Sequence, residues 1–197
     1  MQSIHLTGDA LWSRMERAVE KVHERLRRAV AVLEAEAVPY AVVGGHAVRV
    51  WVSQVDEAAV RNTKDVDILL ERQDLEKIKP AMEQAGFVFR HSAGLVMFLD
   101  GPEGSPREAI HMVFAGEQVR EEEPEPNPGL EHAASVAEFK TLELDTLVKM
   151  KLNSYRLKDR VHLVDMLDVG LIDESWIERL PKSLGARLQQ LIDDPDA

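Results

Sequence analysis

The sequence predicts an α+β protein in which a small mixed sheet is flanked by helices and followed by a helical C-terminal third. Two observations favour this class. Apolar residues recur at three- and four-residue steps near both ends of the chain, as in helices that bury one face. Short apolar runs separated by glycine and proline turns lie between them, as in strands. We expect an N-terminal helix packed on the core (1–36), an α/β core (37–120), and an acidic loop with a C-terminal helical region (121–197).

The first expected element is a helix over residues 9–36. Its apolar face is formed by Met15, Ala18, Val22, Leu26, Ala29 and Leu33. Its other face carries Arg17, Lys21, Arg25, Arg27 and Arg28. We interpret these basic residues as a solvated helix face, with a nucleic-acid contact as the alternative.

A strand, a glycine turn and a second helix follow the first helix. Residues 40–43 form a short apolar run, which predicts a buried strand, and Gly44-Gly45 ends it. The apolar residues of 47–55 predict a helix, and residues 65–70 predict the next strand. This strand alternates at its start between Asp and apolar residues, as expected for a strand with one functional face.

The rest of the core is expected to be a helix and a hairpin. Residues 73–86 predict a helix that ends at a glycine. Residues 87–89, 95–99 and 109–114 predict strands. The sequence EEEPEPNPG at 121–129 predicts an exposed loop.

Beyond this loop we expect the chain to be helical, most clearly over 144–157 and 159–169. Asp159 suits the N-cap of the second of these helices, and a catalytic role is the alternative.

Composition excludes several classes of protein. The 197 residues carry a net charge of −11, which argues against a protein that holds duplex DNA by neutralising its phosphates. The absence of Cys excludes disulfides, Cys-type zinc sites and thiol nucleophiles. No apolar stretch approaches the length of a membrane span, and no secretory signal is apparent, so a cytoplasmic protein is expected.

Two features carry chemistry. Asp65 and Asp67 stand two residues apart on a predicted strand, so they project to the same face. Like charges at this spacing are costly unless a cation lies between them, and Mg²⁺ prefers such oxygen ligands. Gly44-Gly45 precedes a helix, whose free backbone N–H groups and positive dipole end suit a phosphate.

Together these residues resemble a known superfamily. The run from Val43 to Val48, followed by Arg61-x-Thr63-x-Asp65-Val66-Asp67, resembles nucleotidyltransferases of the DNA polymerase β type. The chain is most similar to the AbiEii-type toxin and minimal nucleotidyltransferase branches. A segment from Leu147 to Asp165, which includes Lys151, Arg156, Lys158 and Asp159, is similar to the helical motif of the AbiEii-like branch.

The resemblance implies transfer of a nucleoside monophosphate from an NTP to an acceptor, with release of pyrophosphate. Asp65 and Asp67 would bind Mg²⁺, with Mn²⁺ as an alternative. The residues implied or considered for nucleotide binding are Gly44, Gly45, His46, Arg61, Thr63, Lys151, Arg156 and Lys158. For His46, a solvent-facing position in the first turn of the helix is the alternative.

One position departs from the family pattern. Active members usually carry a third acid on a later strand, and the residue that we align with it is His111. His111 could act as a general base, could bind the metal, or could mark a degenerate site. Asp100 is the other acid considered for this role.

We therefore expect a metal-dependent nucleotidyltransferase that acts on RNA, a protein or a small molecule. The AbiEii resemblance implies a toxin of a toxin–antitoxin pair, with a partner protein that blocks the site. The alternative is a catalytically degenerate module of the same fold that binds nucleotide or a protein partner without turnover. A structural domain without nucleotide affinity ranks last, because it leaves the glycine pair and the paired acids unexplained.

Overall fold

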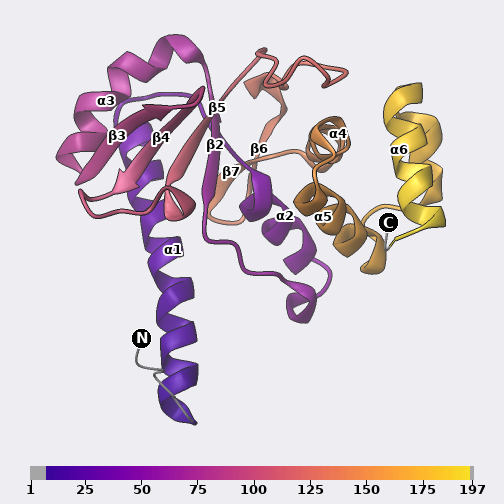
Figure 1. The fold of residues 1–197 in the computed structure, drawn as a ribbon, viewed down its shortest axis with the longest axis horizontal. Coiled ribbons are helices and arrows are strands. Elements are labelled where there is room, and N and C mark those ends of the chain that lie inside the picture. Colours follow the sequence, from indigo (N-terminus) through magenta and orange to yellow (C-terminus); the bar gives the residue numbers. More distant parts are fainter. Residues whose placement is uncertain (1–7, 196–197) are drawn as a thin grey trace.

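The computed structural model describes residues 8–195 and contains a mixed sheet with helices on both faces (Figure 1). The strands are β1 (Ala41–Val43), β2 (Val66–Leu70), β3 (Phe87–Ser92), β4 (Leu95–Asp100), β5 (Ile110–Phe114), β6 (Ala133–Val136) and β7 (Phe139–Leu142). The helices are α1 (Asp9–Ala35), α2 (Gly44–Ser53), α3 (Leu75–Gln84), α4 (Leu144–Ser154), α5 (Leu157–Asp168) and α6 (Lys182–Asp193). The predicted α+β class is confirmed.

Strand β2 lies at the centre of the sheet, whose order is β3-β4-β5-β2-β1-β7-β6. It pairs antiparallel with β1 and parallel with β5. Its side chains alternate between the two faces. Val66, Ile68 and Leu70 belong to one hydrophobic cluster, whereas Leu69 belongs to the other. Asp67 therefore shares its face of the sheet with Leu69.

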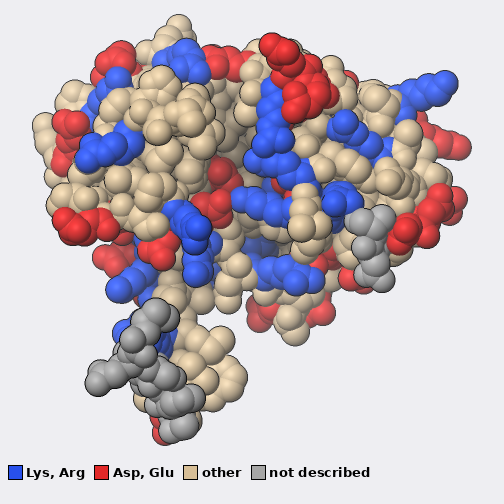
Figure 2. Space-filling view, in the orientation of Figure 1, with Lys and Arg blue, Asp and Glu red and all other residues tan. Residues whose placement is uncertain are grey.

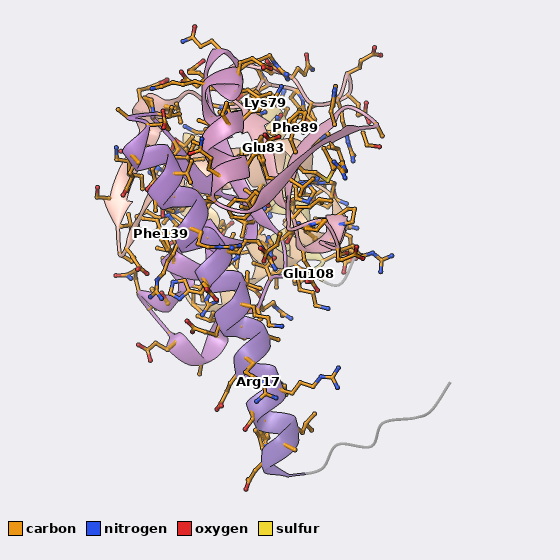
Figure 3. The ribbon with its side chains drawn as sticks, turned by 90° about the vertical axis from the view of Figure 1, so that its left-hand side faces the viewer. Arg17, Lys79, Glu83, Phe89, Glu108 and Phe139 are labelled. Carbon is orange, nitrogen blue, oxygen red and sulfur yellow. The ribbon has the colours of Figure 1, made fainter. Side chains whose placement is uncertain are left out.

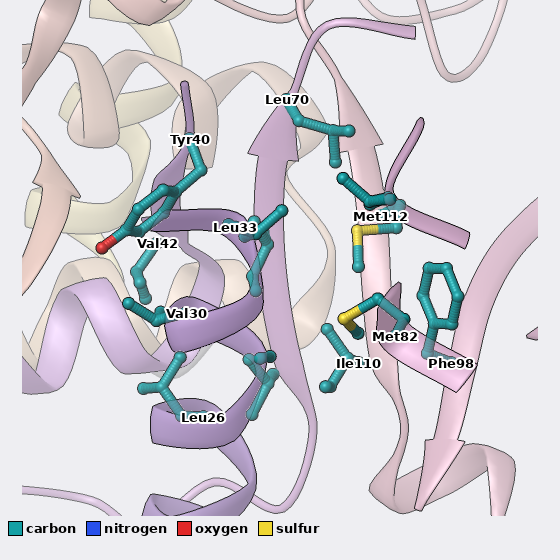
Figure 4. Packing of buried hydrophobic residues seen from close by; sticks show 14 of the residues in the cluster. Leu26, Val30, Leu33, Tyr40, Val42, Leu70, Met82, Phe98, Ile110 and Met112 are labelled. Carbon is teal, nitrogen blue, oxygen red and sulfur yellow. The ribbon is translucent and has the colours of Figure 1, made fainter. Parts of the chain in front are cut away.

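Helices α1 and α3 cover the face that carries Ile68. The cluster there combines Leu26, Val30 and Leu33 of α1 with Met82 of α3 and Ile110 of β5 (Figure 4). These side chains are buried almost completely. The apolar face predicted for the first helix is thus the face that packs on the sheet from Val22 onward.

Helices α2, α4, α5 and α6 form the second cluster with the opposite face of the sheet. Leu69 and Val43 contribute from the strands, and Leu147, Leu163 and Leu188 contribute from α4, α5 and α6. The C-terminal helices therefore cover the face to which Asp67 belongs. Their positions decide how much of that face remains open as a site.

The N-terminal half of α1 projects beyond the sheet, as the position of Arg17 shows (Figure 3). The first buried residue of this helix is Val22, and Trp12 and Met15 are exposed. One expectation for α1 is wrong: Arg25 is only 4% exposed, so it does not belong to a solvated face. No described helix, α1 included, has the length and apolarity that crossing a membrane requires.

The expectation that the chain is purely helical after residue 129 is also wrong. Strands β6 and β7 form an antiparallel hairpin, and β7 pairs parallel with β1. Phe139 and Leu142 are buried on the sheet, which explains why this short segment is a strand. The hairpin extends the sheet on the β1 side, so residues outside 37–120 complete it.

The helix predicted over 73–86 is a 3₁₀ turn, Arg72–Asp74, followed by α3. The helix predicted over 144–157 ends at Ser154, because Tyr155 adopts a left-handed conformation with φ 46°. Helix α5 begins at Leu157 with Arg156 as its N-cap. Asp159 therefore lies in the first turn, and the predicted N-cap role is wrong.

Candidate active site

The turn between β1 and α2 brings Gly44 against Asp67. Gly44 has a φ of +65°, a conformation that favours glycine. A Cβ at this position would lie 2.7 Å from Cγ of Asp67 and would overlap the carboxylate. The absence of a side chain at Gly44 thus makes room for the Asp67 carboxylate at the beginning of α2.

Gly45 has a different neighbour. A Cβ there would lie 3.1 Å from the side chain of Thr63, in the segment that leads into β2. Thr63 in turn donates a hydrogen bond from Oγ1 to Oδ1 of Asp65 over 2.6 Å. The glycine pair therefore lets the acidic segment pack closely against the turn.

Asp65 is held by a cation from the C-terminal helices. Lys158 of α5 donates a hydrogen bond from Nζ to Oδ2 of Asp65 over 2.8 Å. Burial by itself would raise the pKa of Asp65, but the hydrogen bonds from Lys158 and Thr63 outweigh burial and lower it to about 2. Asp65 is thus ionised at neutral pH.

Asp67 has the opposite electrostatic character. Burial and the neighbouring charge of Asp65 both raise the pKa of Asp67. Among the described residues, no hydrogen bond reaches its carboxylate. A half-buried carboxylate that lacks a partner is expected where a ligand supplies one.

A buried network connects α4 to α5 beside these acids. The Asp159 carboxylate accepts hydrogen bonds from Lys151 Nζ over 2.8 Å, Ser154 Oγ over 2.6 Å and Arg156 Nε over 2.8 Å. Burial acts to raise the pKa of Asp159, but the charge of Lys151 and these hydrogen bonds lower it overall. Asp159 therefore fixes the directions of Lys151 and Arg156.

A cavity of about 340 Å³ unites most of these groups. The predicted site residues that line it are Gly44, Asp65, Asp67, His111, Lys151, Arg156 and Lys158. Figure 2 shows the hollow, with acidic side chains on its floor and Lys and Arg side chains along one wall. Carboxylates on the floor and cations on the wall suit a metal-bound polyphosphate.

Four predicted residues do not line this cavity: Gly45, His46, Arg61 and Thr63. Gly45 and Arg61 border a smaller cavity beside α5. Arg61 forms an ion pair with Asp165, with 2.7 Å between Nε and Oδ2, which ties the segment before β2 to α5.

His46 is buried and does not line the cavity, so the alternative of a solvent-facing position is wrong. Its side chain is 4% exposed, and Nε2 has no hydrogen-bond partner. Burial, together with the charge of Arg49, lowers its pKa to about 4, so the ring is neutral at pH 7.

His111 is the register partner of Asp67 on the parallel strand β5. Its Nε2 lies 3.1 Å from the carbonyl oxygen of Pro106. Since a carbonyl only accepts hydrogen bonds, Nε2 carries a proton, and in the neutral form of the ring Nδ1 then has the lone pair. Asp100 does not take the place of a third acid, because Arg25 and Arg28 bind its carboxylate.

Several functional candidates come from the segment after β5, of which residues 121–129 were expected to be an exposed loop. Glu117, Glu123 and Asn127 line the cavity, and both Glu123 and Asn127 are buried. Asn127 donates a hydrogen bond from Nδ2 to the carbonyl of Phe114 over 3.0 Å. Proline and charge content marked this segment as a loop, and no local pattern indicated that it folds back over the site.

Asp65 and Asp67 suit a metal ion that takes only some of its ligands from the protein. No group of three or more His, Asp or Glu side chains within residues 8–195 is arranged to hold a metal ion. The ammonium of Lys158, however, already lies on Asp65 as a cation. A divalent ion bound by Asp65 and Asp67 would need further oxygens from a phosphate or from water, as is usual for Mg²⁺.

Comparison with known proteins identifies the fold. The sequence matches no protein-family model and is not detectably similar to a curated protein. The structure is similar to the nucleotidyltransferase ANT(2'')-Ia, an antibiotic-resistance factor, in its solution structure. The TM-score is 0.52 at 10% identity, and the match covers 88% of this chain and 92% of that one.

Two further solved structures match less well. A crystal structure of ANT(2'')-Ia with adenylyl-2''-tobramycin gives a TM-score of 0.48 at 11% identity, over 88% of this chain and 99% of that one. JHP933 from Helicobacter pylori gives 0.47 at 14% identity, over 92% of this chain and 76% of that one. At these identities the similarity concerns the fold, which is that of nucleotidyltransferases.

Proposed function

We propose that this chain, which has the nucleotidyltransferase fold, is a metal-dependent nucleotidyltransferase. One observation carries the proposal: Asp65 and Asp67 line the same cavity as Lys151, Arg156 and Lys158. The carboxylates suit a divalent metal, and the cations suit the phosphates of an NTP. Lys158 pairs with Asp65, and Lys151 pairs with Asp159, so the charges of both sets are held in place at the cavity.

Asp65 and Asp67 would hold Mg²⁺ or Mn²⁺. When bound there, such a metal neutralises phosphate charge and lowers the pKa of a coordinated hydroxyl. Lys151 and Arg156 are oriented by Asp159, so they are positioned before a nucleotide arrives. Gly44 begins α2, whose backbone N–H groups would bind a phosphate oxygen.

His111 would accept the proton of the acceptor hydroxyl. It lies beside Asp67 on the neighbouring strand, and its Nδ1 has the lone pair that this role requires. The acceptor oxygen would form a bond to the α-phosphorus of the NTP as the bond to pyrophosphate breaks. The hydroxyl proton would pass to Nδ1 of His111.

The same position supports the alternative function. The residue paired with Asp67 is a His and not an acid, which favours a degenerate module that binds nucleotide without turnover. The two functions predict the same nucleotide binding and differ only in turnover. If His111 acts as the base, wild type should show turnover with a suitable acceptor and His111→Ala should lose it. A wild type without turnover that gains turnover in His111→Asp would favour the degenerate module.

Titration calorimetry with each NTP, with and without Mg²⁺, tests the proposal. Wild type should bind an NTP only with Mg²⁺, and Asp67→Asn should lose this binding by about tenfold or more, since it removes a charged ligand. Asp194→Asn, which makes the same charge change at an exposed position, should bind as wild type does. Equal binding by wild type and Asp67→Asn would refute the site assignment.

The similarity of the Arg61–Asp67 and Lys151–Asp165 segments to the AbiEii-like branch supports a role as the toxin of a toxin–antitoxin pair. Expression of such a toxin should arrest growth of a bacterial host, and Asp67→Asn should abolish the arrest. An antitoxin-like partner would then bind over the cavity. Growth arrest that persists in Asp67→Asn would contradict this role.

A further inference from the structure

The cavity contains a carboxylate that the proposed reaction does not use. Glu123 lies in the segment after β5, is 8% exposed, and lines the same cavity as Asp65 and Asp67. Its carboxylate oxygens are not among the fully buried side-chain atoms of the described residues, so they remain accessible at the cavity that Glu123 lines.

Three other acids that line the cavity each bind a positively charged side chain. Asp65 is bound by Lys158, Asp159 is bound by Lys151, and Glu117 accepts a hydrogen bond from Arg72 Nη2 over 2.6 Å. The Glu123 carboxylate, by contrast, has neither a hydrogen bond nor an ion pair with any residue of the described part of the chain. Its positively charged neighbour Arg156 attracts it electrostatically but forms its hydrogen bond, from Nε, with Asp159.

Hydrogen bonds hold the backbone of the segment around Glu123 in place. Its carbonyl oxygen accepts a hydrogen bond from Gln118 Nε2 over 2.7 Å. Two residues on, Glu125 is clamped to Asn153 of α4: its N–H donates to Oδ1 over 2.9 Å, and its carbonyl accepts from Nδ2 over 2.6 Å. These bonds hold the Glu123 side chain at the cavity.

The surroundings of Glu123 indicate what would bind there. The adjoining exposed residues are Arg120, Glu121 and Glu122, so acids outnumber cations around Glu123, and this excess disfavours a nucleic-acid backbone and favours a cation. Leu95 and Val119 also line the cavity and are 51% and 57% exposed, which adds apolar surface. Lys151 and Lys158, which are proposed to bind phosphate, pair with Asp159 and Asp65, so neither of them pairs with Glu123.

From this arrangement we infer that the acceptor is a small molecule with a hydroxyl and an amine, and that Glu123 binds its ammonium group. The inference rests on the proposed nucleotidyl transfer and names its acceptor class. A charged hydrogen bond inside the cavity would fix the acceptor, leaving its hydroxyl free to approach the nucleotide. The cavity of about 340 Å³ is of the size that small-molecule sites have.

Binding of simple amines tests this inference without knowledge of the natural acceptor. The probes are 1,3-diamino-2-propanol and spermidine, and the neutral control is the N,N'-diacetyl derivative of the former, followed by NMR titration. Wild type should bind at least one amine and not the neutral control. Glu123→Gln should weaken amine binding by about tenfold or more, because it removes the charge and keeps the shape.

Glu122→Gln is the matched control, since it makes the same change at an exposed neighbour. It should bind the amines within about twofold of wild type, as expected for a screened surface charge. Circular dichroism and the unfolding midpoint establish that both variants fold. Failure of both amines to bind, equal binding by wild type and Glu123→Gln, or tighter binding of a short RNA with a free 3'-hydroxyl would each overturn the inference.

The test of the acceptor class and the test of the proposed function can fail independently of each other. Binding of an NTP with Mg²⁺ that depends on Asp67, without amine binding, would refute the acceptor class and leave the transferase. Amine binding that depends on Glu123, without NTP binding, would refute the transferase and leave a cation site at Glu123.

Discussion

At the scale of single residues, the site depends on a contact between a glycine and a carboxylate. Gly44 adopts a positive φ and leaves room for Asp67, so the acid lies against the first turn of α2. Glycine is therefore needed at position 44 for two reasons: the positive φ and the space that the Asp67 carboxylate occupies. A substitution there therefore affects stability and binding together.

Gly44→Ala should lose Mg²⁺-dependent NTP binding and should destabilise the protein by about 1–2 kcal/mol from the backbone conformation alone. The new methyl group would also displace the Asp67 carboxylate. Gly86→Ala is the matched control, because Gly86 has a φ of +87°, has open space around it and does not line the cavity. Calorimetry and urea unfolding should show similar destabilisation in the control with binding retained; loss of binding in both variants would contradict the role of the contact.

The paired acids should affect stability in opposite directions with pH. The pKa of Asp65 is lowered from 3.8 to about 2, so its stabilising effect is complete above about pH 4 and is lost as the pH falls toward 2. The pKa of Asp67 is raised, so ionising it in the folded protein costs free energy that appears as the pH rises above 3.8.

In metal-free protein at pH 7, Asp65→Asn should therefore lower the free energy of unfolding, by about 1 kcal/mol or less because Lys158 is half exposed. Asp67→Asn should leave it unchanged or raise it. Both differences should shrink as the pH approaches 2. Urea unfolding at several pH values measures them, and a stronger destabilisation by Asp67→Asn than by Asp65→Asn at pH 7 would show that the electrostatic assignment is wrong.

At the scale of secondary-structure elements, the junction of α4 and α5 is held by a buried charge network. Lys151 and Asp159 are almost fully buried, and each supplies the counter-charge that the other needs. Since this network also sets the directions of Lys151 and Arg156, the junction serves both folding and the site.

Asp159→Asn should destabilise the protein by about 3–5 kcal/mol, because it leaves the Lys151 ammonium buried without a counter-charge. The double variant Lys151→Met, Asp159→Leu should recover much of this stability, since apolar groups need no counter-charge. It should not recover NTP binding. Urea unfolding and calorimetry separate these effects, and a double variant less stable than Asp159→Asn would contradict the explanation.

At the scale of the whole molecule, the C-terminal third is part of the site. Helices α4 and α5 supply Lys151 and Lys158, and their junction supplies Arg156. The two helices also cover Val43 and Leu69 of the central strands. Strand β7 pairs with β1 and completes the sheet. Residues 37–120, the expected α/β core, therefore do not include the C-terminal helices that cover one face of the sheet.

A fragment of residues 1–120 should therefore fail to fold. Removing β7 and the C-terminal helices would expose an extensive apolar surface around Leu69 and leave β1 as an open edge. The fragment should lack a cooperative urea transition and should tend to aggregate. A cooperative transition with native-like circular dichroism would show that the core folds alone.

The sequence alone predicted the class of the fold and most elements, because hydrophobic periodicity is a local property. The strand at residues 40–43 and the helix at the glycine pair follow from spacing within a few residues. The next strand begins at Val66, so Asp65 lies in the bend before it, and the expectation that both acids stand on the strand is wrong for Asp65. The order of the motifs was enough to predict the nucleotidyltransferase fold.

Only the tertiary structure decided which groups meet. His46 follows the glycine pair in sequence but is buried away from the cavity, whereas Glu123 comes from an apparent surface loop and lines it. Strand β7 forms because β1 offers it an edge, and Lys158 reaches Asp65 across 93 positions of the chain. Such contacts depend on how distant segments pack, so no local pattern in the sequence contains them.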